Sequence, residues 1–186
     1  MNFGKRRKEG KMGLQNFLIE HKDDWEEILD KEPYCLKWNK WKGFVSFKYN
    51  QIRSDFSNPI VREARGAVFV ENTWRCVSRG FDKFFNYAEP NASAIDWATA
   101  RVMEKVDGSL MRIFYWGGEW YLITNSGIDA YTAPTGDINY PTFGDIFEAG
   151  LLNLGYKSLE DFCRSNRLMI CKTYMFELVS PYTRVV

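Results

Sequence analysis

The feature of the sequence that most restricts the fold is the alternation of apolar with other residues that follows Pro33. Apolar side chains occupy every second position over residues 34–38 and again over residues 45–49, with Gly43 between them as a turn. A period of two is typical of β-strands that bury one face. Further strands are expected at residues 65–70, 74–79, 101–106, 110–116, 119–124 and 172–179.

Helical patterns flank these strands. Apolar residues recur at helical spacing over residues 14–31, and two more helices are expected at 142–154 and 158–167. Gly117-Gly118 predicts a hairpin turn between two strands, and the polar stretch 131–140 predicts a loop. The sum is an α+β domain with mostly antiparallel sheets and flanking helices.

The composition argues against several classes of protein. Hydrophobic residues make up 45% of the 186 residues and charged residues 26%, with a net charge of +1, which is ordinary for a soluble domain. No apolar run approaches the length needed to cross a membrane. The four cysteines form no CxxC pair and there is one histidine, so neither a structural zinc site nor a Ser-His-Asp triad is expected. We expect a protein of the reducing cytoplasm that contacts no membrane.

The start of the chain is strongly basic. Lysine and arginine crowd residues 5–11, so the sequence divides into a basic tail over residues 1–12 and a domain over residues 13–186. Such a tail either contacts nucleic-acid phosphates through counterion release or is a solvated terminus. The sequence leaves both interpretations open.

The segment Lys105-Val106-Asp107-Gly108 carries the most specific chemistry. A lysine followed two residues later by Asp-Gly is the arrangement with which covalent nucleotidyltransferases attack an α-phosphate. The attacking amine has to be uncharged, and nearby cations together with partial desolvation favour that form. Alone the motif is weak, because it arises by chance in roughly one chain in twenty of this length. The competing interpretation is a lysine on the surface of a hairpin.

Three other segments accompany this motif. Residues 63–70 read Glu-Ala-Arg-Gly-Ala-Val-Phe-Val, and residues 77–89 contain Ser-Arg-x3-Lys-Phe-Phe-Asn. Residues 176–179 read Phe-Glu-Leu-Val and are followed by a Pro-Tyr-Thr-Arg-Val-Val tail. Together with Lys-x-Asp-Gly-Ser-Leu, these segments resemble the RNA ligase family typified by the tRNA-repair ligase of T-even phages. The resemblance runs from Glu63 to the end of the chain, with a gap over 130–170.

The resemblance implies a role for particular residues. Lys105 becomes the nucleophile that carries AMP, Gly108 allows a close approach to the nucleotide, and Asp107 shapes the turn. The arginine of the Arg-Gly element is Arg65, and the lysine before Phe-Phe-Asn is Lys83. Both are expected to contact the nucleotide phosphates, where they would stabilise the charge that builds on pyrophosphate.

Further implications concern the ligands. Glu177 matches a glutamate that contacts the ribose of AMP, and Glu104 resembles a position whose backbone meets adenine. ATP and Mg²⁺ are the expected cofactors, with no side chain assigned as a metal ligand. The expected partner is RNA with 5′-phosphate and 3′-hydroxyl ends, such as tRNA or another nicked RNA, in the host cytoplasm if a phage encodes the protein. The implied fold is a nucleotidyltransferase domain of the ligase and capping-enzyme type.

The chain departs from the family pattern in two places. Where the family carries Lys-Ser-Lys-Gly-Ser, residues 123–127 read Ile-Thr-Asn-Ser-Gly, so a phosphate-contacting lysine falls at Asn125; Lys172 and Arg112 are candidate replacements. The chain also ends at Val186, before the family's Glu-Gly-x-Val and Lys-x-Lys strands. We therefore expect the N-terminal part of an adenylyltransferase domain, completed by a further C-terminal segment or a second polypeptide.

Two alternatives to an RNA ligase remain open on the sequence. A DNA ligase or a GTP-using capping enzyme would share the fold, although the Ser-Arg-x3-Lys-Phe-Phe-Asn element argues against both. A degenerate module that binds nucleotide or RNA without sealing would explain Asn125 and the absent C-terminal motifs.

Overall fold

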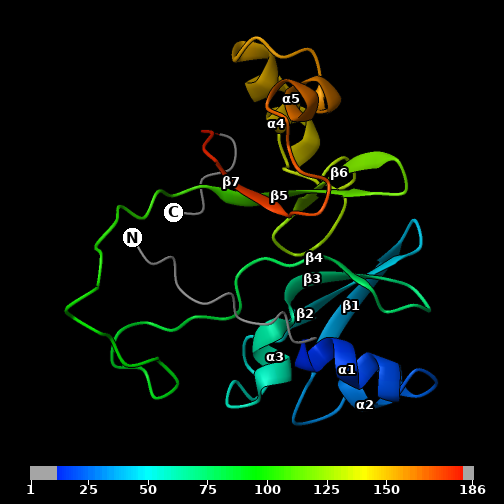
Figure 1. Cartoon of the computed structure of the whole chain (residues 1–186), viewed down its shortest axis with the longest axis vertical. Helices are drawn as coiled ribbons and strands as arrows, with labels where there is room; N and C mark the ends of the chain where they lie inside the picture. The colour runs from blue at the N-terminus through cyan, green and yellow to red at the C-terminus, as the bar shows by residue number, and fades with distance from the viewer. Residues whose placement is uncertain (1–11, 182–186) are drawn as a thin grey trace.

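Two antiparallel sheets lie between two groups of helices in the computed structural model, which describes residues 12–181 (Figure 1). The first sheet has the strand order β1-β2-β3-β4, formed by β1 (Leu36–Trp41), β2 (Phe44–Tyr49), β3 (Arg65–Val70) and β4 (Cys76–Ser78). The second sheet has the order β6-β5-β7, formed by β5 (Ser109–Trp116), β6 (Glu119–Thr124) and β7 (Tyr174–Leu178). The paired strands of both sheets are antiparallel.

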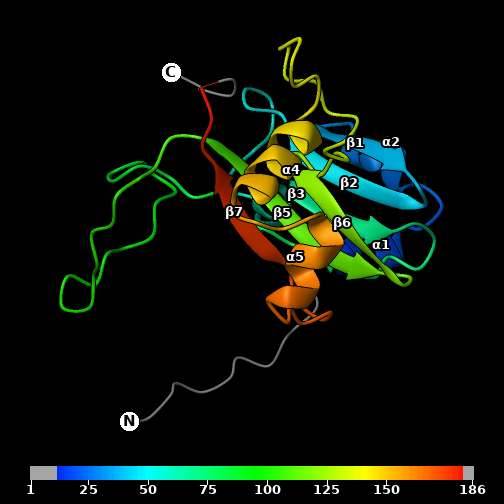
Figure 2. The same cartoon turned by 90° about the horizontal axis from the view of Figure 1, so that it is seen from above.

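Helices cover the outer face of each sheet (Figures 1 and 2). The first sheet carries α1 (Gly13–Glu20), α2 (Trp25–Leu29) and α3 (Pro59–Glu63). The second sheet carries α4 (Phe143–Asn153) and α5 (Leu159–Ser165). The prediction of an α+β domain with antiparallel sheets and flanking helices is therefore confirmed.

Alternation along the central strands explains this layering. In β2, Val45 and Phe47 pack into the core beneath α1 and α2, while Phe44 points toward the second sheet. In β5, Ile113 packs against the α4 and α5 side, and Phe114 points back toward the first sheet. A small apolar cluster consequently joins the two sheets, and its buried members are Phe44, Val68, Phe114 and Ile123.

The prediction of one helix over residues 14–31 is wrong, because a turn at residues 21–24 separates α1 from α2. The side chains at 22–24 are charged and exposed, so they offer no apolar contact that would hold a continuous helix on the sheet. After the turn, Trp25 packs edge-on against Trp38 with 5.2 Å between ring centroids.

The strand expected at residues 101–106 is absent. Residues 79–107 contain no helix or strand, and the segment runs out beside the two sheets (Figures 1 and 2). Val102 and Met103 are 98% and 82% exposed, so no neighbouring strand or core covers them. A strand needs a hydrogen-bonded neighbour, and apolar residues alone do not supply one. The strand expected at 74–79 is shorter in the structure, where only Cys76–Ser78 forms β4 and pairs with β3.

Other local predictions are confirmed. The helices expected at 142–154 and 158–167 are α4 and α5, and each begins at a side-chain cap. The Thr142 side chain accepts the Asp145 N–H, and the Ser158 side chain accepts the Asp161 N–H. Gly117-Gly118 joins β5 to β6, while α3 was not predicted.

Two predictions lie partly or wholly outside the described residues. The basic side chains at residues 5–11 and the last residues, 182–186, belong to the part of the chain that the structure does not describe. Over residues 12–181, none of the helices combines the length and the apolar character that crossing a bilayer requires.

At Gly66 the first sheet lies directly against the loop that follows β6. The register of β2 and β3 shifts there, since Phe47 pairs with Ala67 whereas the next residue, Lys48, pairs with Arg65. Gly66 has a φ of 75°, and a Cβ at this position would lie 1.9 Å from the Asn125 carbonyl oxygen. Glycine is required for both the backbone conformation and the close approach of the loop after β6.

We predict that Gly66→Ala lowers the free energy of unfolding by roughly 2–4 kcal/mol, because left-handed strain adds to a forced separation of the sheets. Gly43→Ala is the matched control, since Gly43 has a φ of 77° but nothing within 4 Å of an added Cβ. The control should lose roughly 1–2 kcal/mol from strain alone. Denaturant titration measures both, and equal losses would show that the contact with Asn125 is not restrictive.

Candidate functional site

A cavity of about 580 Å³ opens where the end of β2 meets the start of β5 and the loop that follows β6. Its size lies within the range of small-molecule sites in proteins. Three segments that are distant in the sequence line this cavity together: Lys48 of β2, Gly108 with the first residues of β5, and Asn125 with Ser126 in the loop. The remaining lining residues are Ser109, Leu110, Met111, Thr124, Ile128, Ala133, Pro134 and Phe143.

Gly108 is held against β7 at the edge of this cavity. A Cβ on Gly108 would lie 2.6 Å from the Leu178 carbonyl oxygen and 3.1 Å from Cγ of Glu177. The structure therefore brings Gly108 and Glu177 together, as two of the predicted site residues. The neighbours of Glu177 on β7, Phe176 and Leu178, pack toward α4 and α5. The predicted alternation, with Glu177 on the face opposite those two residues, is confirmed.

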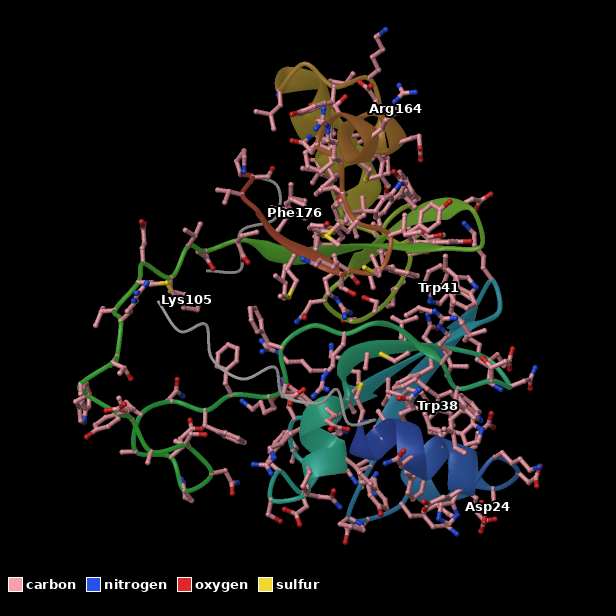
Figure 3. The ribbon with its side chains drawn as sticks, in the orientation of Figure 1. Asp24, Trp38, Trp41, Lys105, Arg164 and Phe176 are labelled. Carbon is pink, nitrogen blue, oxygen red and sulfur yellow. The ribbon has the colours of Figure 1, made fainter. Side chains whose placement is uncertain are left out.

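Lys105 lies apart from this cavity. Its side chain is exposed on the segment that runs beside the sheets, away from the labelled Trp41 and Phe176 (Figure 3). Glu104 and Asp107 are exposed on the same segment. The structure thus leaves the predicted nucleophile outside the cavity, although Gly108, three residues further along the chain, forms part of its wall.

Arg65 is fixed by the segment that follows β4. Its Nη1 donates a hydrogen bond to the Asp82 carbonyl oxygen at 3.3 Å, and its guanidinium lies 4.4 Å from the centroid of the Phe84 ring. A cation over an aromatic face is attracted by the ring quadrupole. These contacts hold Arg65 at the start of β3, directly across from Lys48 of β2.

Lys83 lies on the same segment but in different surroundings. Its backbone N–H donates to the Arg62 carbonyl oxygen at 2.8 Å. Its Nζ lies 5.0 Å from the ring centroid of Phe85 and 5.6 Å from that of Phe56. Lys83 lines a second cavity, of about 270 Å³, together with Arg62, Phe84 and Phe85. Residues 82–84 therefore lie against Arg65. Lys105 belongs to the later, exposed part of the same 79–107 segment.

A buried guanidinium ties the two sheets together. Arg112 of β5 is 0% exposed, and its Nη2 donates to the carbonyl oxygens of Gly66, Thr124 and Asn125. Its Nε and Nη1 have no partner among the described residues. Burial lowers the pKa of Arg112 to about 10, because desolvation disfavours the charged form. Arg112 therefore positions the loop after β6 instead of lining the cavity as a replacement cation.

Burial affects the reactivity of two cysteine thiols, and the described residues form no cluster of metal-ligating side chains. Burial raises the pKa of the Cys76 thiol to about 11 and that of Cys163 to about 12, so both stay protonated and unreactive at neutral pH. Within residues 12–181, no three or more His, Cys, Asp or Glu side chains gather in a way that could hold a metal ion.

Lys48 is the cavity residue that the sequence reasoning missed. It is exposed on a strand whose other members are all buried, and it occupies the face that points toward the second sheet. The sequence contains an indication of this position, because Lys48 interrupts a largely apolar strand between Phe47 and Tyr49. Its side chain lies on the face opposite to theirs. No family motif drew attention to that position.

Comparison with known proteins places these residues in context. A family model described as RNA ligase matches residues 63–186, which includes the span from Arg65 to Glu177. Over 172 residues, the chain is 30% identical to a protein of Autographa californica nuclear polyhedrosis virus described as a bifunctional polynucleotide kinase/RNA ligase. That match covers 87% of this chain and 24% of the viral protein.

Shorter matches extend the comparison to phage and bacterial proteins. RNA ligase 1 of bacteriophage TS2126 is 42% identical over 72 residues, which cover 34% of this chain and 18% of the phage protein. A Thermovibrio ammonificans protein described as an RNA ligase is 36% identical over 70 residues, covering 36% of this chain and 18% of that protein. The chain thus spans a quarter or less of the length of these relatives.

We predict that Gly108→Ala weakens the pairing of β5 with β7 and lowers the free energy of unfolding by roughly 1–3 kcal/mol, since the added methyl group overlaps the Leu178 carbonyl. Gly150→Ala in α4 is the control, because an added Cβ there meets nothing within 4 Å. That helical substitution should instead stabilise by roughly 0.5–1 kcal/mol. Thermal or denaturant unfolding distinguishes the two, and a neutral Gly108→Ala would contradict the contact.

Proposed function

The chain belongs to the RNA ligase family of the T4 type, and on that premise we propose that it transfers AMP from ATP to Lys105 and then to an RNA end. The observation that carries the proposal is the position of the Lys-x-Asp-Gly segment. It lies inside the matched residues 63–186, and its glycine, Gly108, both forms part of the cavity wall and contacts Glu177 of β7. The two facing antiparallel sheets support a nucleotidyltransferase type of domain.

In the first step, the neutral amine of Lys105 attacks the α-phosphorus of ATP. A phosphorus–nitrogen bond forms, the bond from the α-phosphorus to the bridging oxygen breaks, and pyrophosphate leaves. The amine loses one proton to solvent. Positive groups that hold the triphosphate would stabilise the leaving pyrophosphate and favour the neutral amine. Arg65 and Lys83 are the residues proposed for this work.

Two further steps complete the sealing of RNA. An oxygen of the RNA 5′-phosphate attacks the phosphorus of the lysyl-adenylate; the phosphorus–nitrogen bond breaks, the Lys105 nitrogen takes up a proton from solvent, and AMP is left on the RNA end. The 3′-hydroxyl of a second end then attacks the RNA phosphorus and loses its proton to solvent, while the bond to the bridging oxygen breaks and AMP leaves. Chemistry of this kind depends mainly on positioning and on stabilising charge.

The proposal requires Lys105 to enter the cavity when ATP binds. Gly108 lies three residues after Lys105, and an extended chain covers about 10 Å over those three residue steps. Rotation of the backbone near Gly108 would therefore carry Lys105 to the cavity mouth. Residues 101–107 make no strand pairing that such a movement would break.

ATP and Mg²⁺ fit the character of the site. The cavity of about 580 Å³ has an apolar side at Met111 and Phe143 and a polar side at Lys48 and Ser126, which suits a base with a phosphate chain. Mg²⁺ would be held chiefly by the phosphates of ATP, since the described residues offer no cluster of metal ligands. The ion would supply charge neutralisation at the leaving group.

One observation favours a second candidate function, a module that binds nucleotide or RNA without catalysis. Lys105 is exposed on the segment beside the sheets, whereas Arg65 and Lys83 lie against the aromatic rings of Phe84 and Phe85. A binding module would hold ATP or RNA equally well after loss of the Lys105 amine. Catalysis and binding alone therefore differ in one measurable property, the covalent label.

We predict that the protein becomes labelled when incubated with Mg²⁺ and ATP carrying ³²P on the α-phosphate, and that Lys105→Ala abolishes the label. The matched control is Lys157→Ala, because Lys157 is exposed near the start of α5, far along the chain from the Lys-x-Asp-Gly segment. Labelling is read on a denaturing gel, which removes nucleotide that is not covalently bound.

The other outcomes decide between the alternatives. Label that persists in Lys105→Ala, or a wild-type protein that binds ATP but takes no label, contradicts the catalytic proposal, and the second result supports the binding module. Labelling by α-labelled GTP in place of ATP would favour a capping enzyme. Transfer of the label to a 5′-phosphorylated DNA in preference to RNA would favour a DNA ligase.

A further inference from the structure

The loop after β6 presents no cation to the cavity, although the sequence resemblance led us to expect a phosphate-contacting lysine at position 125. Residues 125–127 are Asn-Ser-Gly, and both Asn125 and Ser126 line the cavity with neutral side chains. The two cations that the sequence offered as replacements do not fill the gap. Arg112 is buried against backbone carbonyls, and Lys172 is exposed and is not part of the cavity lining.

We propose that Lys48 of β2 supplies this missing cation and contacts the phosphates of ATP. The inference rests on the proposed function and adds a residue to it. Lys48 lines the cavity opposite the neutral loop, and its Nζ donates to the Ser126 Oγ at 3.4 Å. Lys48 thus places a positive charge beside the neutral loop.

The packing of the loop on β2 fixes this geometry. The indole Nε1 of Trp41 donates to the Gly127 carbonyl oxygen at 3.0 Å. A Cβ on Gly127 would lie 2.6 Å from Cβ of Ser46, which is two residues before Lys48 on the same face of β2. Residues two apart on a strand share a face, so the loop rests on the face from which Lys48 projects.

Lys48 also lies beside a cation that the family resemblance assigns to the phosphates. Lys48 and Arg65 are direct partners in the register of β2 with β3. Directly opposite residues of an antiparallel pair project on the same side of the sheet. The bulge at Gly66 creates this pairing, so the Arg-Gly element aligns Arg65 with Lys48. Two cations next to each other, across from a neutral loop, suit a ligand with several negative charges.

In the described part of the chain, lysines near Lys48 are paired with carboxylates, whereas Lys48 is free to bind a phosphate. Lys40 pairs with Glu26 and Glu71, Lys42 pairs with Asp129, and Lys37 pairs with Asp30. Over residues 12–181, Lys48 has no carboxylate within ion-pair distance and contacts a hydroxyl instead. A bound triphosphate would give Lys48 the charged partner that its neighbours already have.

Lys48 lies outside the matched residues 63–186, so family motifs do not identify it. The test compares Lys48→Ala with Lys37→Ala. Lys37 faces Lys48 across the β1–β2 register. Both lysines line a smaller adjacent cavity, of about 260 Å³, but only Lys48 also lines the one formed by Gly108 and Asn125. The two variants remove the same charge from neighbouring exposed positions.

Calorimetric binding of ATP and of AMP provides the first readout, and the apparent KM for ATP in lysyl-adenylate labelling provides the second. Lys48→Ala should weaken ATP binding about tenfold or more, because a charge-assisted contact to phosphate is lost, while AMP binding changes little. Lys48→Arg should retain most of the affinity for ATP. Lys37→Ala should stay within about twofold of wild type.

A charge exchange separates a phosphate contact from a structural effect. The double variant Lys48→Ser with Ser126→Lys moves the ammonium group from the strand to the loop across the 3.4 Å contact, and it should recover ATP binding relative to Lys48→Ala. The midpoint of thermal unfolding should not fall in Lys48→Ala, since the exposed side chain has no ion pair to lose. Both results together support the proposal.

Several outcomes would overturn it. If Lys48→Ala binds ATP as wild type does, Lys48 is not a phosphate contact, whether or not Lys105 takes up label. Equal weakening of ATP and AMP would show that Lys48 shapes the cavity without contacting the outer phosphates. Loss of the label in Lys105→Ala with no effect at Lys48 overturns this inference and leaves the proposed function intact. Label that survives Lys105→Ala overturns the proposed function instead.

Discussion

The close approach of the two sheets at Gly66 is the contact on which the rest of the structure depends. Here the backbone of β3 meets the Asn125 carbonyl and the buried guanidinium of Arg112 with no room for a side chain. The bulge at this position also sets Arg65 opposite Lys48. One glycine therefore fixes both the separation of the sheets and the alignment of the positive groups. A larger residue would move the cavity wall as well as destabilise the fold.

The cavity is a consequence of how each strand divides its two faces. Apolar positions of β2 and β5 pack outward against the helices, and only a small cluster around Phe44 and Phe114 joins the sheets. Toward the ends of these strands the cluster gives way to Lys48 and Gly108, so an open polar space takes its place. The chemistry proposed for the protein needs such a place, because a charged nucleotide requires cations on one side and apolar contacts on the other.

Local patterns in the sequence were sufficient to predict most helices and strands, but not how these elements pack together. Alternation predicted the strands that have a neighbour to pair with, and capping residues such as Ser158 predicted helix starts. The same reasoning failed at residues 101–106, because β-propensity does not supply a pairing partner. Motifs led to Gly108 and Glu177, which the fold brings together. Lys48 carried no motif, and only the strand register and the packing of the loop on β2 reveal its place in the cavity.

We propose that Lys105 carries AMP, and peptide mapping can locate the modified residue. After incubation with Mg²⁺ and ATP, trypsin should cut after Arg101 and Arg112 but not after a modified Lys105. Mass spectrometry should then find the peptide 102–112 with the added mass of one adenylyl group on Lys105. An adenylyl group on a different lysine, or an unmodified Lys105 in a protein that has consumed ATP, would show that Lys105 is not the nucleophile.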